Sequence, residues 1–305
     1  MTHERIGMTR TDTPPGWKAS FHGGHSAAYC DHAKDSLEDI LEAAAAFGYH
    51  TFGVAEHAPR VLPEHLYEEE RDLGWDVATL DRLFTEYAAA LDRLQAEYTG
   101  RMTVLKGFEA EVVPEGRYAA LMRGYRERLG FEYMVGSVHW VAGAVIDYRA
   151  DHFARAVRAH GGLEPMARAY YRLVADMVEA LEPEIVGHLD LLRTGAGEAE
   201  ISTPAVRRAA FEALDVIAAH GALLDVNTGG YRKGFGRPFP APWLVKAAQE
   251  RGIGFIFGDD SHAVAHVGAG LEEARQYLLE LGVRSVALLQ RAPGGGLARR
   301  DTPLA

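Results

Sequence analysis

A chain of 305 residues can form one large α/β barrel, a fold of about 250 residues, or two smaller domains. Its formal net charge of -11 argues against broad nucleic-acid binding, which draws most of its affinity from a basic surface. No apolar run approaches the roughly 18 residues that predict a membrane span, and residues 1–18 lack the apolar centre of a secretory signal. The single cysteine, Cys30, excludes a disulfide framework. We therefore expect a cytoplasmic protein without nucleic-acid or membrane partners.

Short apolar strands alternate with amphipathic helices along the chain. Strands are predicted over residues 18–21, 51–54, 103–107, 133–136, 184–187, 223–226 and 253–257, and Ser285–Leu289 is a candidate for a further strand. Ser36 and Asp39 form a capping box ahead of a helix that ends at Gly48, and Thr203 caps a helix that closes at Gly221. Further helices are predicted over residues 78–98, 164–181, 241–251 and 269–281. The alternation predicts a parallel sheet or barrel.

The chain shows no internal repeat and no linker that would divide it. We expect one catalytic barrel domain over residues 18–293, preceded by a flexible N-terminal extension over residues 1–17. Residues 294–305 begin with three glycines and include Arg299 and Arg300, so they are expected to form a flexible C-terminal tail.

Histidines and acids follow most of the predicted strands. They are His22, His25, His57, Glu109, His139, His188, Asp260 and His262, with His32 on the loop behind the first pair. A lone histidine after a strand is more often a loop residue or a helix cap, but the strand ends of an α/β barrel share one face, which carries the active site. Imidazole and carboxylate together suit zinc, manganese or iron, and so many ligands exceed the needs of one ion. A site for several metal ions is predicted.

The remaining histidines and the cysteine are interpreted as structural. His3, His50, His65, His152, His160, His220 and His266 fall in the N-terminal extension, in loops or in helical stretches. Cys30 has no partnered base at a recognisable spacing, so we interpret it as a small buried hydrophobe rather than a nucleophile.

Several short motifs, in their order, resemble the PHP (polymerase and histidinol phosphatase) family. They are residues 25–33, 56–60, 107–111, 136–139, 187–190, 225–228 and 260–262. Residues 136–139, Arg60 with Leu66 and Tyr67, and the stretch from Asn227 to Lys233 are similar to its monofunctional histidinol-phosphatase branch. The resemblance implies a single-domain distorted TIM-like (β/α)7 barrel with three divalent metal ions. By position, His22, His25, Glu109 and Asp260 would hold the first ion; Glu109, shared as a bridge, would hold the second with His139 and His188; His32, His57 and His262 would hold the third.

The first histidine pair departs from the family pattern of His-x-His. Here His22 and His25 are separated by Gly23 and Gly24. Because glycine tolerates positive φ, the two glycines are expected to let the loop bulge so that His22 still reaches the metal. The alternative is a displaced His22 with a weakly held ion or a two-metal site.

The resemblance implies hydrolysis of L-histidinol phosphate to L-histidinol and phosphate in histidine biosynthesis, by a metal-activated hydroxide that attacks phosphorus. The candidate phosphate-binding residues are Arg60, Arg193, Arg232 and Lys233, and the candidate partner of the substrate amine is Glu111. The candidate catalytic residues are Glu109 and Asp190. Asp190 would protonate the leaving group or support a metal ligand. The loop from Val61 to Trp75 would cover the imidazole.

Three other functions are weighed against this one. The first is a PHP-family phosphoesterase that acts on another small phosphomonoester or on phosphotyrosine. The second is a metal-dependent amidohydrolase, which is disfavoured because a strict His-x-His start and a metal-bridging lysine are not evident. The third is a non-catalytic PHP module, which is disfavoured because almost every ligand position is filled.

Overall fold

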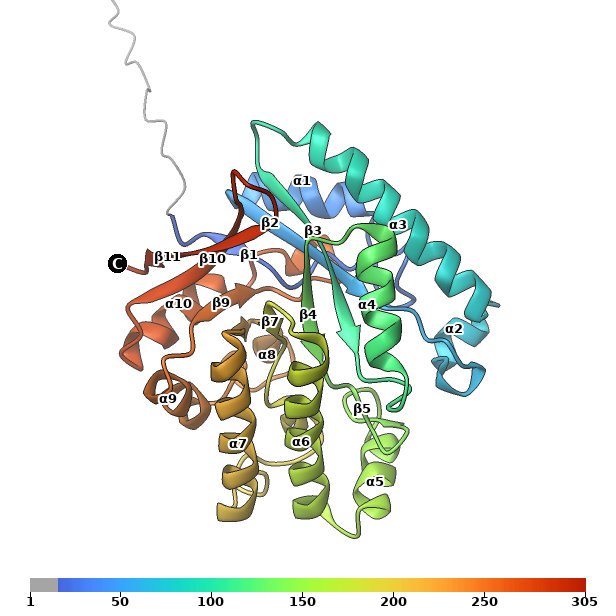
Figure 1. The fold of residues 1–305 in the computed structure, drawn as a ribbon, viewed down its shortest axis with the longest axis vertical. Helices are drawn as coiled ribbons and strands as arrows, with labels where there is room; N and C mark the ends of the chain where they lie inside the picture. The colour runs from blue at the N-terminus through green and yellow to red at the C-terminus, as the bar shows by residue number, and fades with distance from the viewer. Residues whose placement is uncertain (1–15) are drawn as a thin grey trace, which may run out of the picture.

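The computed structural model describes residues 16–305 and contains a seven-stranded parallel sheet. The strands pair in the order β1 (Ala19–Ser20), β2 (Thr51–His57), β3 (Thr103–Glu111), β4 (Tyr133–Ser137), β7 (Ile185–Val186), β8 (Leu223–Asn227) and β9 (Phe255–Gly258). The Phe21 amide donates to the Phe257 carbonyl at 2.9 Å, so the segment after β1 also bonds to the last strand. The predicted distorted (β/α)7 barrel is confirmed (Figure 1).

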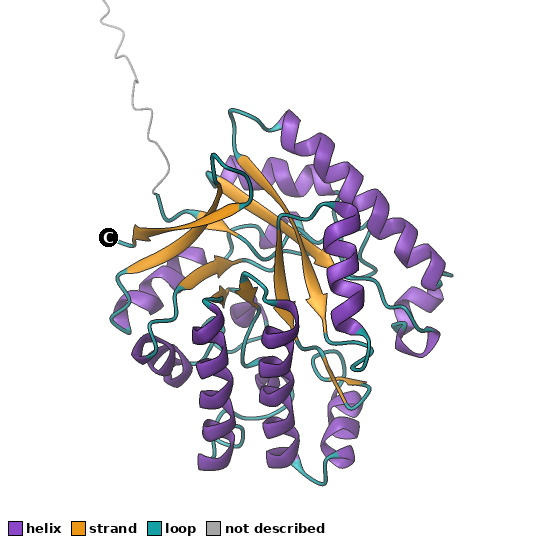
Figure 2. Cartoon of the chain, in the orientation of Figure 1, coloured by secondary structure: helices purple, strands orange, loops and turns teal. Residues whose placement is uncertain are grey.

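Helices surround the sheet (Figure 2). The longer ones are α1 (Leu37–Phe47), α3 (Val77–Glu97), α4 (Tyr118–Leu129), α5 (Ala150–Ala159), α6 (Leu163–Leu181), α7 (Pro204–His220), α9 (Pro242–Glu250) and α10 (Leu271–Glu280). Both predicted caps are present, since the Ser36 side chain accepts from the Asp39 amide and the Thr203 side chain from the Val206 amide. Among residues 16–305, no helix is both long and apolar enough to cross a bilayer.

Short elements connect the strands on the face where they end. They are η1 (Pro63–His65), α2 (Glu68–Asp72), the hairpin of β5 (Trp140–Val141) and β6 (Ala144–Val145), η2 (Leu191–Thr194), α8 (Gly229–Arg232) and η3 (Val264–His266). Sequence periodicity did not predict these pieces, because each is too short to show a repeating apolar face. They form the walls of the site described below.

The inside of the barrel is packed with side chains. Leu105, Val135 and Ile256 belong to one apolar cluster there, together with Tyr133. The Tyr133 ring occupies the space over Gly107, where a Cβ atom would overlap the ring. Its hydroxyl donates to the Phe21 carbonyl at 3.0 Å, which satisfies the buried oxygen. The strands therefore enclose a rigid core rather than a channel.

The C-terminal residues form a hairpin, so the prediction of a flexible tail over residues 294–305 is wrong. β10 (Ser285–Arg291) pairs antiparallel with β11 (Leu297–Pro303) along their whole length. The glycines form the turn, with Gly295 and Gly296 at φ 92° and 70°. Leu288 and Leu289 join the apolar cluster of the barrel interior. Residues 1–15 of the predicted N-terminal extension lie outside the described residues.

Candidate metal centre

The alternation of side chains along β2 and β3 delivers acids and a histidine to the inside of the barrel. Leu105 lies in the interior apolar cluster, and successive side chains of a strand point to opposite faces. Glu109 and Glu111 therefore face the same interior at the end of β3, where both are fully buried. His57 has the same relation to the interior residue Ala55 in β2. The polar residues lie directly beyond the apolar core.

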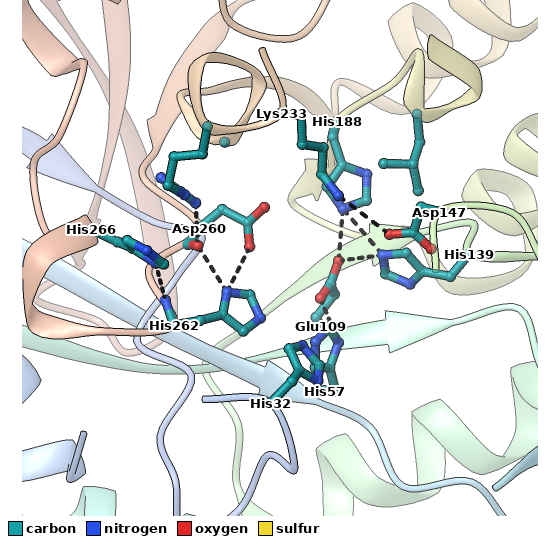
Figure 3. Close-up of a pocket in the computed structure, with 13 residues that line it drawn as sticks. His32, His57, Glu109, His139, Asp147, His188, Lys233, Asp260, His262 and His266 are labelled. Carbon is teal, nitrogen blue, oxygen red and sulfur yellow. Dashed lines mark hydrogen bonds and ion pairs between the residues drawn. The ribbon is translucent and has the colours of Figure 1, made fainter. Parts of the chain in front are cut away.

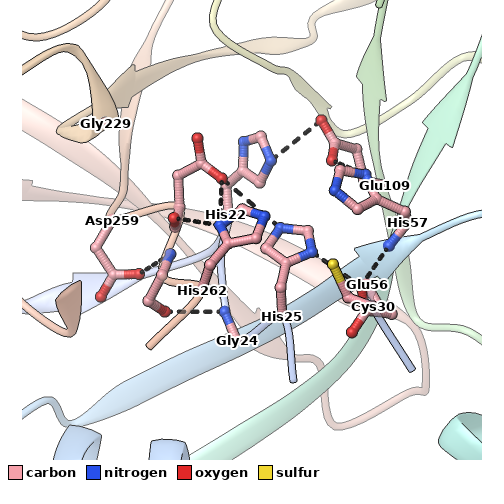
Figure 4. Close-up of polar contacts among 12 residues, drawn as sticks. His22, Gly24, His25, Cys30, Glu56, His57, Glu109, Gly229, Asp259 and His262 are labelled. Carbon is pink, nitrogen blue, oxygen red and sulfur yellow. Dashed lines mark hydrogen bonds and ion pairs between the residues drawn. The ribbon is translucent and has the colours of Figure 1, made fainter. Parts of the chain in front are cut away.

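Glu109 lies among four imidazoles, of which His57, His139 and His188 are drawn in Figure 3 and His22 in Figure 4. Its Oε1 atom lies 3.2 Å from His22 Nε2, 3.2 Å from His188 Nε2 and 3.5 Å from His139 Nε2. Its Oε2 atom lies 2.8 Å from His57 Nδ1. Burial alone would raise the pKa of Glu109, but the surrounding imidazoles hold it well below its ordinary value. The residue is thus an anionic carboxylate with histidines on both oxygens, an arrangement suited to bridging two cations.

A second cluster adjoins the first and consists of His25, Cys30, His57 and His262 (Figure 4). Each offers one ligand atom, and the four atoms lie within 4.8 Å of one another. The rings of His25 and His262 stack with centroids 4.0 Å apart. The ring of His32 stacks on the far side of His262 at 4.7 Å, and its side chain is 46% exposed. His57 belongs to both clusters, so they form one continuous site.

Many buried polar atoms of this site lack a hydrogen-bond partner. They include Nε2 of His22, His25, His57 and His262, and both carboxylate oxygens of Glu109. One unpaired buried donor or acceptor costs about 1–3 kcal/mol, so an ordinary protein core does not contain so many unpaired polar atoms in one place. Imidazole nitrogens and carboxylate oxygens are the ligands that divalent transition metals take in proteins. The donor set fits bound divalent cations.

Carboxylates behind two histidines fix their orientation. His22 Nδ1 lies 2.7 Å from Asp225 Oδ2, and His25 Nδ1 lies 2.9 Å from Glu56 Oε1. Asn227 Nδ2 donates to the same Asp225 oxygen at 2.9 Å. A carboxylate on Nδ1 favours the tautomer with its proton there, which leaves the Nε2 lone pair free for a metal. Both rings present Nε2 to the clusters.

The loop between His22 and His25 bulges as the two glycines suggest. Gly23 and Gly24 have φ of 149° and 81°, a region that favours glycine. The Gly24 amide donates to Ser261 Oγ at 3.0 Å, which ties the bulge to the loop after β9. His22 consequently reaches Glu109.

A cavity of about 350 Å³ opens above the clusters. Its lining comprises His32, His57, Glu109, His139, Asp147, His188, Leu191, Gly229, Arg232, Lys233, Asp260, His262 and His266. Arg232 Nη2 donates to the Asp260 carbonyl at 2.6 Å, and Lys233 Nζ lies 4.0 Å from Asp147 Oδ2 (Figure 3). Two cations therefore stand opposite the carboxylate and imidazole floor, in a position to bind an anionic group.

Comparison with known proteins agrees with this geometry. Residues 23–229 match the model of the PHP domain family. A probable histidinol-phosphatase of Schizosaccharomyces pombe is 30% identical over 278 residues, which cover 89% of each chain. The chain belongs to the PHP domain family.

Solved structures support the PHP fold. A protein of Listeria monocytogenes aligns with a TM-score of 0.72 at 23% identity, over 84% of this chain and 99% of that chain. The histidinol phosphate phosphatase of Lactococcus lactis was solved with zinc, L-histidinol and phosphate. It aligns with a TM-score of 0.64 at 18% identity, over 89% of this chain and 96% of that chain.

In this PHP chain, all nine side chains predicted as metal ligands come together. Seven line the cavity, and His22 and His25 lie buried beneath it in contact with the other ligands. Asp260 has a positive φ of 50°, a strained conformation for a residue other than glycine. Its Oδ1 atom lies 3.7 Å from His25 Nε2 and 3.6 Å from His262 Nδ1. The backbone strain thus occurs where a carboxylate faces both clusters.

Two of the four predicted phosphate-binding residues do not reach the cavity lining. Arg60 pairs with Glu70 and stacks on the Tyr67 ring at 4.7 Å. Arg193 Nη1 lies 3.4 Å from Asp190 Oδ2 and donates to the Pro238 carbonyl at 3.1 Å. Both guanidinium groups are buried with carboxylate partners behind the wall, so the predicted contact with phosphate is not what the structure presents. Arg232 and Lys233 do line the cavity, and their contact with phosphate stays a prediction.

The contacts of Asp190 and Glu111 also differ from those that their predicted roles require. Asp190 Oδ2 accepts from the Ala241 amide at 2.9 Å, and the residue does not line the cavity. Burial raises the pKa of its carboxyl. Glu111 Oε1 lies 3.2 Å from His57 Nδ1 and 3.7 Å from Arg60 Nη1. Its carboxylate therefore contacts residues of the cavity wall, not a position for a substrate amine. Asp190 and Glu111 support neighbouring residues.

Sequence reasoning missed three acids of the site. Glu56 and Asp225 orient His25 and His22, and both lie inside motifs that carried the family resemblance, so their position was a usable signal. Asp147 lines the cavity after the β5–β6 hairpin, which no sequence pattern predicted.

Proposed function

We propose that the protein is a metal-dependent phosphatase that hydrolyses L-histidinol phosphate to L-histidinol and phosphate in histidine biosynthesis. The observation that carries this proposal is the buried array of unpartnered imidazole and carboxylate atoms beneath a cavity that Arg232 and Lys233 line. The names of its relatives support the substrate, as does the Lactococcus lactis protein solved with L-histidinol and phosphate. The lone cysteine is in keeping with a cytoplasmic enzyme.

Three divalent ions, of zinc, manganese or iron, are proposed for the site. Their ligands would be His22, His25 and Asp260 with Glu109 for the first, Glu109 with His139 and His188 for the second, and His32, His57 and His262 for the third. Bound divalent cations supply Lewis acidity, which lowers the pKa of water toward about 7 and neutralises charge on phosphoryl oxygens. Zinc in the Lactococcus lactis relative supports the choice of metals.

The chain's own residues bind and orient the substrate. Arg232, held by the Asp260 carbonyl, offers its remaining guanidinium donors to phosphate oxygens, and Lys233 adds a second positive charge. Asp190 does not line the cavity, so the leaving oxygen must take its proton from a group that does. We assign this role to Asp147, whose carboxylate lies beside Lys233 on the cavity wall and would take up the proton that the attacking water loses and pass it to the leaving oxygen.

A side pocket of about 250 Å³ adjoins the metal cavity and is proposed to hold the histidinol end of the substrate. Both cavities share Asp147 and Lys233, and the side pocket adds Tyr67, Glu69 and Tyr148. The rings of Tyr67 and Tyr148 stack at 5.8 Å, and the Tyr148 hydroxyl donates to Glu69 Oε1. Glu69 Oε2 is buried without a partner, so it can accept from an ammonium group. Tyr67 and Glu69 belong to the loop that was expected to cover the imidazole.

The metal-loaded enzyme is expected to prefer L-histidinol phosphate over p-nitrophenyl phosphate and phosphotyrosine by about a hundredfold or more in kcat/KM, because buried polar groups discriminate strongly against ligands that leave them unpaired. Steady-state phosphate release across a panel of monoesters measures this preference. Equal kcat/KM values across the panel would favour the alternative, a PHP phosphoesterase with another small phosphomonoester or phosphotyrosine substrate.

Glu69→Gln is expected to raise KM for L-histidinol phosphate by roughly 10–100-fold, the equivalent of one charge-assisted hydrogen bond of about 1.5–3 kcal/mol. KM for p-nitrophenyl phosphate should change little, because that substrate has no ammonium group. Glu68→Gln is the matched control, since Glu68 is exposed and pairs with Arg149. An equal loss on both substrates would indicate structural damage rather than recognition.

A further inference from the structure

Cys30 is the only cysteine of the chain, and it lies within the metal centre rather than in an apolar core. Its side chain is buried, yet among residues 16–305 it belongs to none of the apolar clusters. Its sulfur is instead grouped with the ligand nitrogens of His25, His57 and His262, within 4.8 Å of one another (Figure 4). Cys30 is therefore buried, as it was interpreted to be, but its neighbours are candidate metal ligands rather than apolar side chains.

The loop after β1 holds the thiol in this position. The Cys30 amide donates to the Ser26 carbonyl at 2.9 Å, and the Cys30 carbonyl accepts from the Ala33 amide at 3.3 Å. Cys30 Sγ lies 3.4 Å from Nδ1 of His32, whose side chain is half-exposed. The Cys30 thiol is thus buried, whereas the His32 imidazole, which was predicted as a ligand of the third ion, lies closer to the surface.

Independent evidence for a ligand comes from the histidines that the thiol faces. His25 is fully buried, and its Nε2 has no hydrogen-bond partner; the same holds for the buried Nε2 of His262. Zinc binds sulfur at about 2.3 Å and nitrogen at about 2.0–2.1 Å, so two ligand atoms of one tetrahedral ion lie about 3.4–3.6 Å apart. The four atoms lie within 4.8 Å of one another, so each pair must close by no more than about 1.4 Å to hold one ion.

We propose that Cys30 binds, as a thiolate, the divalent ion held by His57 and His262. This inference rests on the metal dependence proposed above, and it adds Cys30 to the ligands proposed for the third ion. On binding, the metal–sulfur bond replaces the S–H bond and the proton leaves to solvent. Because thiolate is a soft ligand, this position should prefer zinc over manganese, whereas the ions held by imidazole and carboxylate alone should discriminate less.

Reconstitution of the metal-stripped protein with cobalt(II) tests the proposal. A thiolate bound to cobalt gives an intense charge-transfer band in the near ultraviolet, and a site of imidazole and carboxylate ligands does not. Since no other cysteine exists in the chain, any such band belongs to Cys30. We expect the band in the wild type, its loss in Cys30→Ser, and its retention in the control Tyr29→Phe on the same loop.

Metal affinity provides the second measurement. Cys30→Ser should weaken zinc binding at one site per chain by more than the roughly 10–100-fold that follows loss of a group that only orients a ligand. It should also shift the preference of that site toward manganese. A wild-type protein that binds cobalt and hydrolyses phosphomonoesters without showing the band would overturn the role of Cys30 and leave the proposed function standing. A protein that binds no cobalt and needs no metal for activity would overturn both.

Discussion

Glu109→Gln is expected to lower kcat/KM by well over the roughly 10–100-fold typical of residues that merely support a metal ligand. Glutamine keeps the shape of the side chain but removes its negative charge, and its amide group turns donors toward the imidazoles. The carboxylate contacts four histidines through its two oxygens, so no other single side chain can take its place between the ions. Elemental analysis should show a fall in bound metal together with the fall in rate.

Glu111→Gln is the matched control for this variant. Glu111 lies on the same strand, faces the same interior and is equally buried, but it approaches His57, His139 and Arg60 through its Oε1 atom alone. We expect a smaller loss of activity and an unchanged metal content. If both variants lose the same activity while Glu109→Gln retains its metal, Glu109 is not the bridge. Far-ultraviolet circular dichroism of both proteins checks that the barrel remains folded.

The barrel itself was predictable because its signals are local. The cap at Ser36, the cap and first-turn proline at Thr203 and Pro204, and the apolar faces that follow them are legible in short stretches of sequence. Once strands and helices alternate, the rule that strand ends share one face brings distant histidines together. That rule found the nine proposed ligands before any contact between them was known.

The residues that sequence reasoning misplaced depend on contacts between distant segments. Arg60 was a reasonable phosphate ligand until Glu70, on a five-residue helix, was seen to pair with it. Arg193 is likewise held by Asp190 and packs against the rings of Phe235 and Phe239. A motif shows that an arginine is near a site, but whether its charge faces substrate is decided by the carboxylates packed beside it.

The C-terminal hairpin shows that contacts between distant segments also limit the prediction of strands. The three glycines at 294–296 suggested a flexible end, and the charged residues Arg299, Arg300 and Asp301 interrupt the apolar pattern of the strand that contains them. Only pairing with β10 shows that Thr302 and Leu304 are buried while the charged side chains face outward. A strand whose partner covers the end of a barrel carries little apolar signal of its own.

Removal of bound metal is expected to abolish phosphatase activity and to lower the unfolding midpoint. An ion present at 100 times its dissociation constant stabilises the folded chain by about 2.7 kcal/mol. In chains of 150–250 residues, one kcal/mol corresponds to about 2–4 °C in the unfolding midpoint. We therefore expect the midpoint to fall by on the order of 5–10 °C. The reason lies in the centre itself, where buried carboxylate oxygens and imidazole nitrogens would remain without partners.

Calorimetry and phosphate release before and after exhaustive chelation measure the two effects together. Zinc added back should restore both the midpoint and the rate. Magnesium is the control, because it takes oxygen ligands and leaves an imidazole-rich site unfilled. Both quantities should therefore follow the zinc content of the protein, and full activity at less than one metal ion per chain would contradict the proposed chemistry. A midpoint that falls while activity persists would make the metals structural, and the water-activating role assigned to them would have to pass to side chains of the cavity.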